Sequence, residues 1–234
     1  MIEIAQIRKL SLWIFIIPLL GINLCLFITV NHHLLENTIF TVDQIGRSNF
    51  TFPYFDGGLS ISRASRTFPA YLIFKPSMIL TSILVYFYWS KNNKIINTFN
   101  STSGKNYKFR TFGIISAICL AIHAVLLGVE IDIKIFKLFR RVVLLSFIIF
   151  EIAAQGLLVH SFYKLKDRIK DLFNPNILMC KILLVSILIV VALVSLPIVV
   201  TKGNIHFKHA LEWNYFVGVI LFYFFTRLFW RRTT

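Results

Sequence analysis

Long apolar runs alternate with more polar connections along this chain, and each run has the length of a membrane-spanning helix. Six runs stand out, at about residues 11–31, 69–90, 111–130, 142–163, 177–200 and 210–230. A helix rises 1.5 Å per residue, so about 20 apolar residues cross the roughly 30 Å hydrocarbon core of a bilayer. The pattern predicts an all-α fold, with residues 1–234 forming one integral membrane bundle of six transmembrane helices and a long exofacial first loop.

Composition points to the same class of protein. Hydrophobic residues make up 57% of the 234 residues and charged residues 15%, whereas soluble domains are nearer half apolar and a quarter charged. The first run follows Arg8 and Lys9 like a signal peptide, but it is longer than such a peptide's apolar region and no small-residue cleavage site follows it. We therefore expect a retained anchor and a multi-pass protein of the plasma membrane or an endomembrane, depending on the host.

The distribution of positive charge predicts the orientation. The formal net charge is +15. Lys and Arg are more numerous in the N-terminal segment, the connections 91–110 and 164–176 and the C-terminal tail than in the alternate connections. The positive-inside rule then predicts cytoplasmic N- and C-termini and an exofacial first loop. Because these charges flank apolar runs, they favour membrane lipids as partners, through a phospholipid or glycolipid headgroup, and not nucleic acid. The oligomeric state is left open.

Several polar residues lie deep within the apolar runs. His123 is in the third run, and Glu151 and Gln155 share one face of the fourth at i,i+4 spacing. Such groups hydrogen-bond between helices, line a functional pocket or form a proton or ion path; all three remain open, and His123 is the expected partner of Glu151. Lys75 and Lys181 lie near run ends, where a lysine side chain can extend to the headgroups.

The exofacial rim holds a second group of polar residues. The first loop contributes a Ser- and Arg-rich segment, and Glu130 and Asp132 end the third run. The sixth run begins with His206, His209, Glu212 and Trp213. Arginine pairs with phosphate through two parallel hydrogen bonds, so the rim suits a lipid headgroup. The predicted ligand-binding residues are Asp56, Ser60, Ser62, Arg63, Arg66, Glu212 and Trp213.

Two other functions compete with lipid binding. A membrane-embedded lipid hydrolase or acyltransferase would use Ser62, His206, His209 or Glu212, with a histidine as base for a serine. A small transporter or channel would need a polar path past the buried His, Glu and Gln. The sequence has no GxSxG, Walker, GxGxxG or CxxC motif. His206, His209 and Glu212 match no recognised zinc spacing, so we expect no metal and no cofactor.

Two segments carry a family resemblance. In "SISRASRTFPAYLIF" (60–74) the informative positions are Ser60, Ile61, Ser62, Pro69 and Phe74, and "HALEWNYF" (209–216) opens the sixth run with Ala210, Glu212 and Trp213. Together with six runs of similar length and order, these resemble the DRAM/Frag/Sfk membrane family, which includes the N-terminal domain of Cwh-type proteins.

The resemblance implies a lipid-linked role. Family members are associated with lipid remodelling of GPI anchors, with phospholipid distribution and with autophagy-linked lysosomal membranes. The chain departs from the family pattern at Arg63, where the family commonly has an acid, and at Ser65, which replaces a glycine. If that acid matters, its role is either lost here or carried by Asp56.

Overall fold

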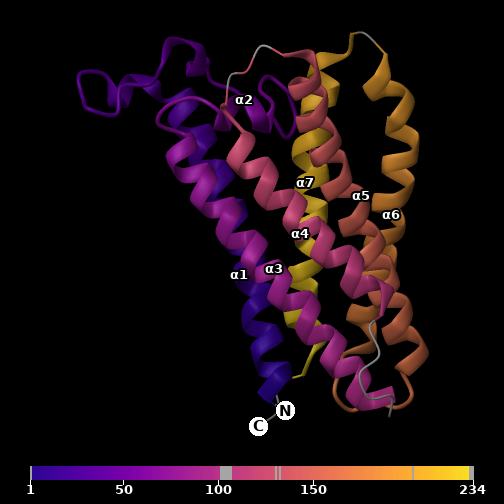
Figure 1. Cartoon of the computed structure of the whole chain (residues 1–234). Coiled ribbons are helices and arrows are strands. Elements are labelled where there is room, and N and C mark those ends of the chain that lie inside the picture. The colour runs from indigo at the N-terminus through magenta and orange to yellow at the C-terminus, as the bar shows by residue number, and fades with distance from the viewer. Residues whose placement is uncertain (1, 101–106, 130, 132, 202, 232–234) are drawn as a thin grey trace.

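The computed structural model describes residues 2–100, 107–129, 131, 133–201 and 203–231. Long helices dominate it (Figure 1), which confirms the all-α class. The six long helices are α1 (Ile2–Val30), α3 (Tyr71–Asn100), α4 (Lys108–Leu126), α5 (Lys134–Leu165), α6 (Pro175–Val200) and α7 (Ile205–Phe229). The first loop contains the short helix α2 (Ile61–Ser65) and the 3₁₀ turns η1 (His32–Leu35) and η2 (Gln44–Gly46).

Five helices are long and apolar enough to cross a membrane: α1, α3, α4, α5 and the Pro175–Ser195 part of α6. Length and composition of this kind are typical of a multi-pass membrane protein. The sixth long helix, α7, is not among the five, and its first two turns contain His206, Lys208, His209 and Glu212.

The helices differ in length from the predicted runs. α1 begins at Ile2, α3 continues to Asn100 and α5 begins at Lys134, because polar residues continue a helix beyond its apolar part as long as no glycine or proline stops it. α4 ends at Leu126, short of the predicted 130. Gly128 follows with φ +81, a left-handed conformation that turns the chain out of the helix.

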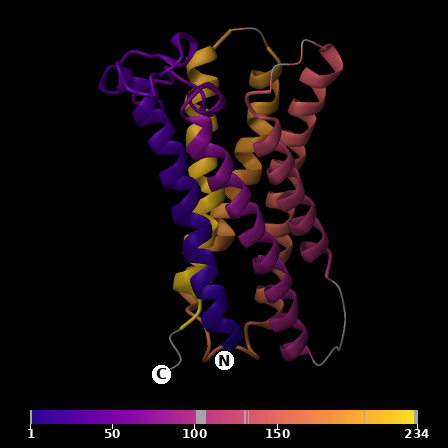
Figure 2. The same ribbon diagram turned by 60° about the vertical axis from the view of Figure 1, so that its left-hand side comes forward.

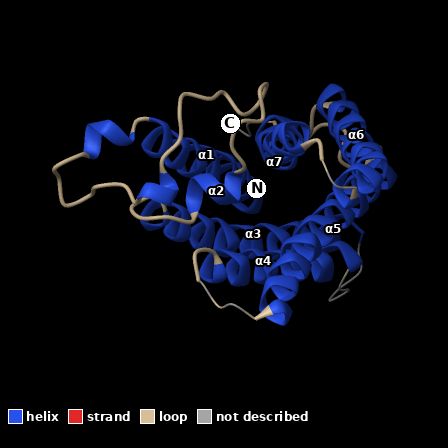
Figure 3. Ribbon diagram, turned by 90° about the horizontal axis from the view of Figure 1, so that it is seen from above, coloured by secondary structure: helices blue, strands red, loops and turns tan. Residues whose placement is uncertain are grey.

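The helices form a closed ring. α1 packs against α3 and α7, and neighbouring helices from α3 to α7 pack against one another in chain order. Seen along the helices, α3 and α4 lie on one side, with α1 and α7 opposite (Figure 3). The chain termini lie together at one end, called the termini end below (Figure 2). The first loop and the α6–α7 connection lie at the other, the loop end.

Two apolar clusters fill the interior. The larger extends toward the termini end and contains Trp89, Phe222, Tyr223 and Trp230. The smaller joins α1, α2, α3, α4 and α7 near the loop end, around Trp213. The second cluster holds α2 and the start of α7 in place, and with them the segments that form the rim site.

Candidate functional site

The first loop folds back over the start of α7. The indole N–H of Trp213 donates to the carbonyl oxygen of Leu59 at 2.8 Å, and the Trp213 ring contacts Tyr54 edge-on with centroids 4.9 Å apart. Asn214 Nδ2 donates to the Tyr54 carbonyl oxygen at 2.7 Å. Trp213 is fully buried, so these contacts fasten residues 54–59 to α7.

Gly57 allows a close approach between the loop and α7. Its φ is +60, and a Cβ added there would lie 1.7 Å from the carbonyl oxygen of His206. His209 Nδ1 lies 2.9 Å from the Gly57 carbonyl oxygen. Because a carbonyl oxygen only accepts hydrogen bonds, Nδ1 must carry the proton, and Nε2 of a neutral His209 ring is then an acceptor.

α2 meets α7 at Glu212. Ser60 caps α2 by accepting a hydrogen bond from the backbone N–H of Arg63 at 3.2 Å, and its hydroxyl oxygen lies 3.4 Å from that of Ser62. The Glu212 carboxylate lies near the backbone N–H groups of Ile61 and Ser62 at the start of α2. Thus the structure brings Ser60, Ser62, Glu212 and Trp213 together, as a frame that holds α2 against α7.

Asp56 stabilises the turn that brings the loop to α7. Its carboxylate accepts hydrogen bonds from Thr51 Oγ1 at 2.6 Å, from the Phe52 N–H at 2.7 Å and from the Gly58 N–H at 2.8 Å. The Thr51 hydrogen bond, followed by that of Gly58, lowers the pKa of Asp56 below its usual value. These bonds occupy both carboxylate oxygens, so the structure gives Asp56 a role in shaping the loop.

This turn is expected to loosen in acid. Because folding lowers the pKa of Asp56, the ionised carboxylate contributes fully to loop order above the usual aspartate pKa of about 3.9. This contribution is lost as the pH falls through the lower pKa that Asp56 has in the folded protein. Limited digestion with pepsin measures this: the native loop should resist cleavage at about pH 5 and lose that protection at lower pH. In Asp56→Asn, the protection of the loop should not change over this pH range. A native loop whose protection also stays constant would contradict the expectation.

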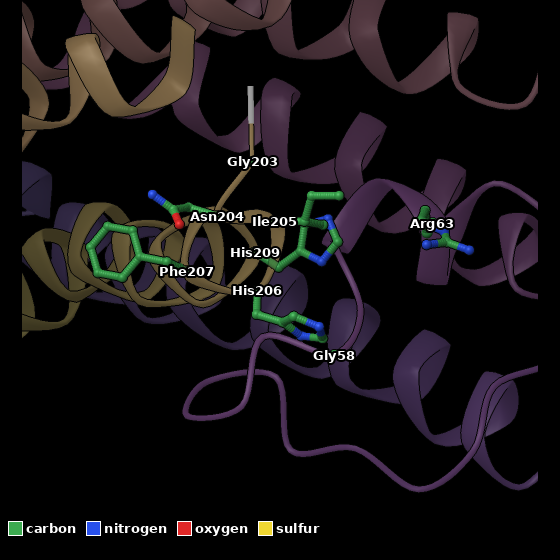
Figure 4. A pocket seen from close by; sticks show the side chains of 8 residues that line it. All are labelled: Gly58, Arg63, Gly203, Asn204, Ile205, His206, Phe207 and His209. Carbon is green, nitrogen blue, oxygen red and sulfur yellow. The ribbon is translucent and has the colours of Figure 1, made fainter. Parts of the chain in front are cut away.

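An open pocket lies beside this frame at the loop end. Its volume is about 590 Å³, and Arg63, His206 and His209 are its ionisable lining residues. Figure 4 shows the two imidazole rings on the side of α7 that faces the segment carrying Arg63. The rest of the lining is Gly58, Gly203, Asn204, Ile205 and Phe207.

Of the remaining predicted rim residues, Arg66 is described by the structure and lies apart from the pocket lining. Arg66 follows the last residue of α2 and is exposed, and it is not among the pocket-lining residues. Glu130 and Asp132 lie outside the described residues. Sequence reasoning missed Gly58, Gly203, Asn204, Ile205 and Phe207; the only local signal was the Gly203-Asn204 pair, typical of a turn before a helix.

The hydrogen bond between a serine nucleophile and a histidine base, which the hydrolase hypothesis requires, is absent among the described residues. Within the part of the chain that the structure describes, no hydrogen bond joins His206 or His209 to Ser62 or Glu212. Ser62 instead lies near Ser60, and Glu212 lies near the backbone at the start of α2. The geometry therefore gives these four residues no assembled catalytic arrangement.

A second polar group is buried inside the bundle around Glu151. Ser116 of α4 donates to Oε2 at 2.6 Å, Gln155 donates to Oε1 at 3.0 Å, and the Tyr223 hydroxyl of α7 also donates to Oε1. Gln155 reaches α7 as well, through the carbonyl oxygen of Val219 at 3.2 Å. Glu151 is 1% exposed, so this group cross-links α4, α5 and α7 within the bundle.

The expected pairing of His123 with Glu151 is absent. His123 lies about two turns further along α4 than Ser116, toward the loop end, and its buried Nδ1 has no hydrogen-bond partner in the described structure. Ser116 and Tyr223 take its place because they project to the depth of Glu151 from the neighbouring helices.

Lys181 does not extend to the membrane surface as the sequence suggested. It is fully buried, and its Nζ donates to Thr226 Oγ1 at 2.6 Å and lies 3.8 Å from the centre of the Phe222 ring. Thr226 donates its own proton to the carbonyl oxygen of Phe222, so its oxygen also accepts from the Tyr88 hydroxyl at 2.9 Å. The expectation failed because Lys181 lies on the face of α6 that packs against α7.

Comparison with known proteins finds no match to this chain among family models, curated proteins or solved structures. The class of multi-pass membrane protein therefore rests on the five long apolar helices themselves.

Proposed function

We propose that this chain is a six-span integral membrane protein that binds an anionic lipid headgroup at its exofacial end, and so helps to organise or remodel membrane lipids. The observation that carries the proposal is the pocket of about 590 Å³ at the loop end, lined by Arg63, His206 and His209. Among the described residues, no aspartate or glutamate lines this pocket.

The proposed topology includes α7 as the sixth span. α7 lies between α1 and α6 in the ring, so its apolar part shares the depth of the five other long helices. Both termini lie at the same end, as an even number of spans requires (Figure 2). The excess of Lys and Arg toward the termini end supports a cytoplasmic location for the termini.

The chemistry of the pocket suits a phosphate attached to a lipid. The exposed guanidinium of Arg63 can pair with two phosphate oxygens. The first turn of α7 lines the same pocket, and the backbone N–H groups at the start of a helix attract anions because they lack partners within the helix. Ile205 and Phe207 add apolar surface for the glycerol and upper acyl chain.

Membership of the DRAM/Frag/Sfk family is part of the proposal. Its support is that the two segments carrying the resemblance lie against each other, through Glu212 with the Ile61 and Ser62 backbone and through Trp213 with Leu59. Arg63 replaces the family's usual acid and makes the pocket more cationic, which favours headgroup binding over chemistry that needs the acid.

The experiment compares two arginines of the same loop. Purified protein in nanodiscs is titrated with short-chain phosphatidic acid and phosphatidylcholine, and co-purified lipids are identified by mass spectrometry. Arg63→Ala should weaken binding of the anionic lipid about tenfold or more, since hydrogen bonds to charged groups contribute about 1.5–3 kcal/mol. Arg66→Ala is the matched control, because Arg66 is exposed but not among the pocket-lining residues, and should bind normally. Equal binding by the native chain and Arg63→Ala, or equal losses in both variants, would contradict the proposal.

A further inference from the structure

The first loop carries large apolar side chains with no protein to cover them. Between residues 34 and 55, here called the arm, Ile39 is 86% exposed, Ile45 76%, Phe50 87% and Phe55 84%. Leu34, Phe40 and Phe52 are each about half exposed. A loop in water rarely gathers so many exposed isoleucine and phenylalanine side chains, and a surface of this kind is typical of a protein–protein or membrane interaction site.

The arm's charged groups are engaged within the loop. Arg47 lies 3.6 Å from Glu36 and donates to the Val42 carbonyl oxygen at 3.2 Å. Asp43 accepts a hydrogen bond from the backbone N–H of Phe68 at 3.3 Å. These contacts engage the charged side chains with groups of the loop itself, while the large Ile and Phe side chains beside them project outward without a protein partner.

The arm follows directly on an exposed apolar face of α1. Leu20, Leu24 and Phe27 lie along one exposed face of that helix at i, i+4 and i+7, and Leu34 follows just beyond its end. Figures 1 and 2 show the first loop beside the end of α1 and level with the upper turns of α5 and α6. Figure 3 shows it projecting sideways, away from the ring of helices. In the proposed topology, this level corresponds to the headgroup–acyl boundary of the exofacial leaflet.

We infer that the arm is a membrane anchor, which lies in the exofacial leaflet with its Ile and Phe side chains among the lipid glycerol and upper acyl groups. The occupant of this apolar surface is lipid, because the surface continues that of α1 and its charges are internally paired. Interfacial segments bind in this way in proportion to the apolar area they bury.

The arm leads directly into the segment that forms the headgroup pocket. The rings of Phe52 and Phe55 stack with centroids 5.4 Å apart, and Tyr54, between them in sequence, contacts Trp213 of α7. Two residues after Phe55, Gly57 lies against His206. An arm held in the leaflet therefore keeps the pocket at the level of the lipid phosphates. The inference uses the proposed membrane topology but not the identity of the pocket's ligand.

The test measures the depth of spin labels in the bilayer. In a chain with Cys25, Cys119 and Cys180 replaced, single cysteines are introduced as Phe50→Cys and Phe55→Cys, whose native side chains are almost fully exposed. Leu24→Cys on the outer face of α1 serves as the lipid-exposed reference, and Thr201→Cys near the α6–α7 connection serves as the aqueous reference. All four are labelled and reconstituted into vesicles of phosphatidylcholine and phosphatidylglycerol.

The readout is the ratio of collision with oxygen, which concentrates in lipid, to collision with a water-soluble nickel chelate. We expect both arm labels to give a higher ratio than the Thr201 label, close to the ratio of the Leu24 label. Aqueous ratios at both arm positions, with a lipid ratio at Leu24, would overturn the inference. So would labels shielded from both reagents, because a protein partner or second copy would then cover the arm. An aqueous Leu24 label would instead refute the membrane topology, and the Arg63→Ala result tests the pocket separately.

Discussion

Glu151→Ala is expected to destabilise the helix bundle by about 2–5 kcal/mol, because three side-chain donors lose their acceptor and each hydrogen bond between membrane helices contributes about 0.6–1.7 kcal/mol. The loss falls on three helices at once, since Ser116 belongs to α4, Gln155 to α5 and Tyr223 to α7. Unfolding of the purified protein in mixed micelles, followed by circular dichroism, measures the change in free energy.

Glu151→Gln provides the matched comparison. Its side-chain oxygen can still accept from Tyr223 and Gln155, and its amide can donate to the Ser116 hydroxyl oxygen. We therefore expect Glu151→Gln to cost no more than about 1 kcal/mol. Glu36→Ala, which removes an exposed partner of Arg47, controls for loss of an acidic side chain as such and should cost less than about 1 kcal/mol. An alanine variant as stable as the native chain would show that the Glu151 cluster does not hold the helices together.

Trp213→Ala is expected to cost about 3–5 kcal/mol, the usual loss when a buried aromatic side chain is truncated. It removes the contact with Tyr54 and the hydrogen bond to Leu59, so the loop segment 54–59 should also separate from α7. Unfolding in mixed micelles gives the stability change, and limited proteolysis reports release of the loop.

Trp213→Phe separates packing from hydrogen bonding. Phenylalanine keeps most of the apolar contact and loses only the N–H group, so we expect a loss of about 0.5–1.5 kcal/mol and a loop that remains protected. Because the released loop carries Gly58 and Arg63 away from α7, Trp213→Ala should also lose anionic lipid binding. Native-like protease resistance in Trp213→Ala would mean that other contacts suffice to hold the loop.

The sequence predicts much of the fold because the bilayer imposes a length on every apolar run. The sequence also predicts that Glu151 and Gln155 share one face of their helix, because they are four residues apart. That face turns inward because a carboxyl group within an apolar helix requires hydrogen-bond partners. The sequence does not identify those partners. Ser116 and Tyr223 are 35 and 72 residues away from Glu151, and nothing local distinguishes them from other polar residues in apolar helices.

At the rim, too, the sequence identifies residues but not their arrangement. Arg63 and Arg66 look equivalent in the sequence, but α2 ends at Ser65, so only Arg63 extends from the helix into the pocket lining. The approach of Gly57 to His206 depends on a left-handed φ and on a contact 149 positions along the chain. Neither condition can be deduced from one glycine in a loop, which is why the sequence indicated the rim residues without their arrangement.

Lys181 determines the rotational register of α6. Almost every side chain of this helix is apolar, so hydrophobicity alone gives no reason for one face to turn inward. The buried positions Leu178, Lys181, Val185 and Leu188 follow one another at helical spacing, and the lysine is the only one of them that lipid would strongly reject. Turning α6 by one residue, about 100°, would move that amine from Thr226 and Phe222 toward the acyl chains. A single costly side chain thus gives an otherwise featureless helix one orientation in the bundle.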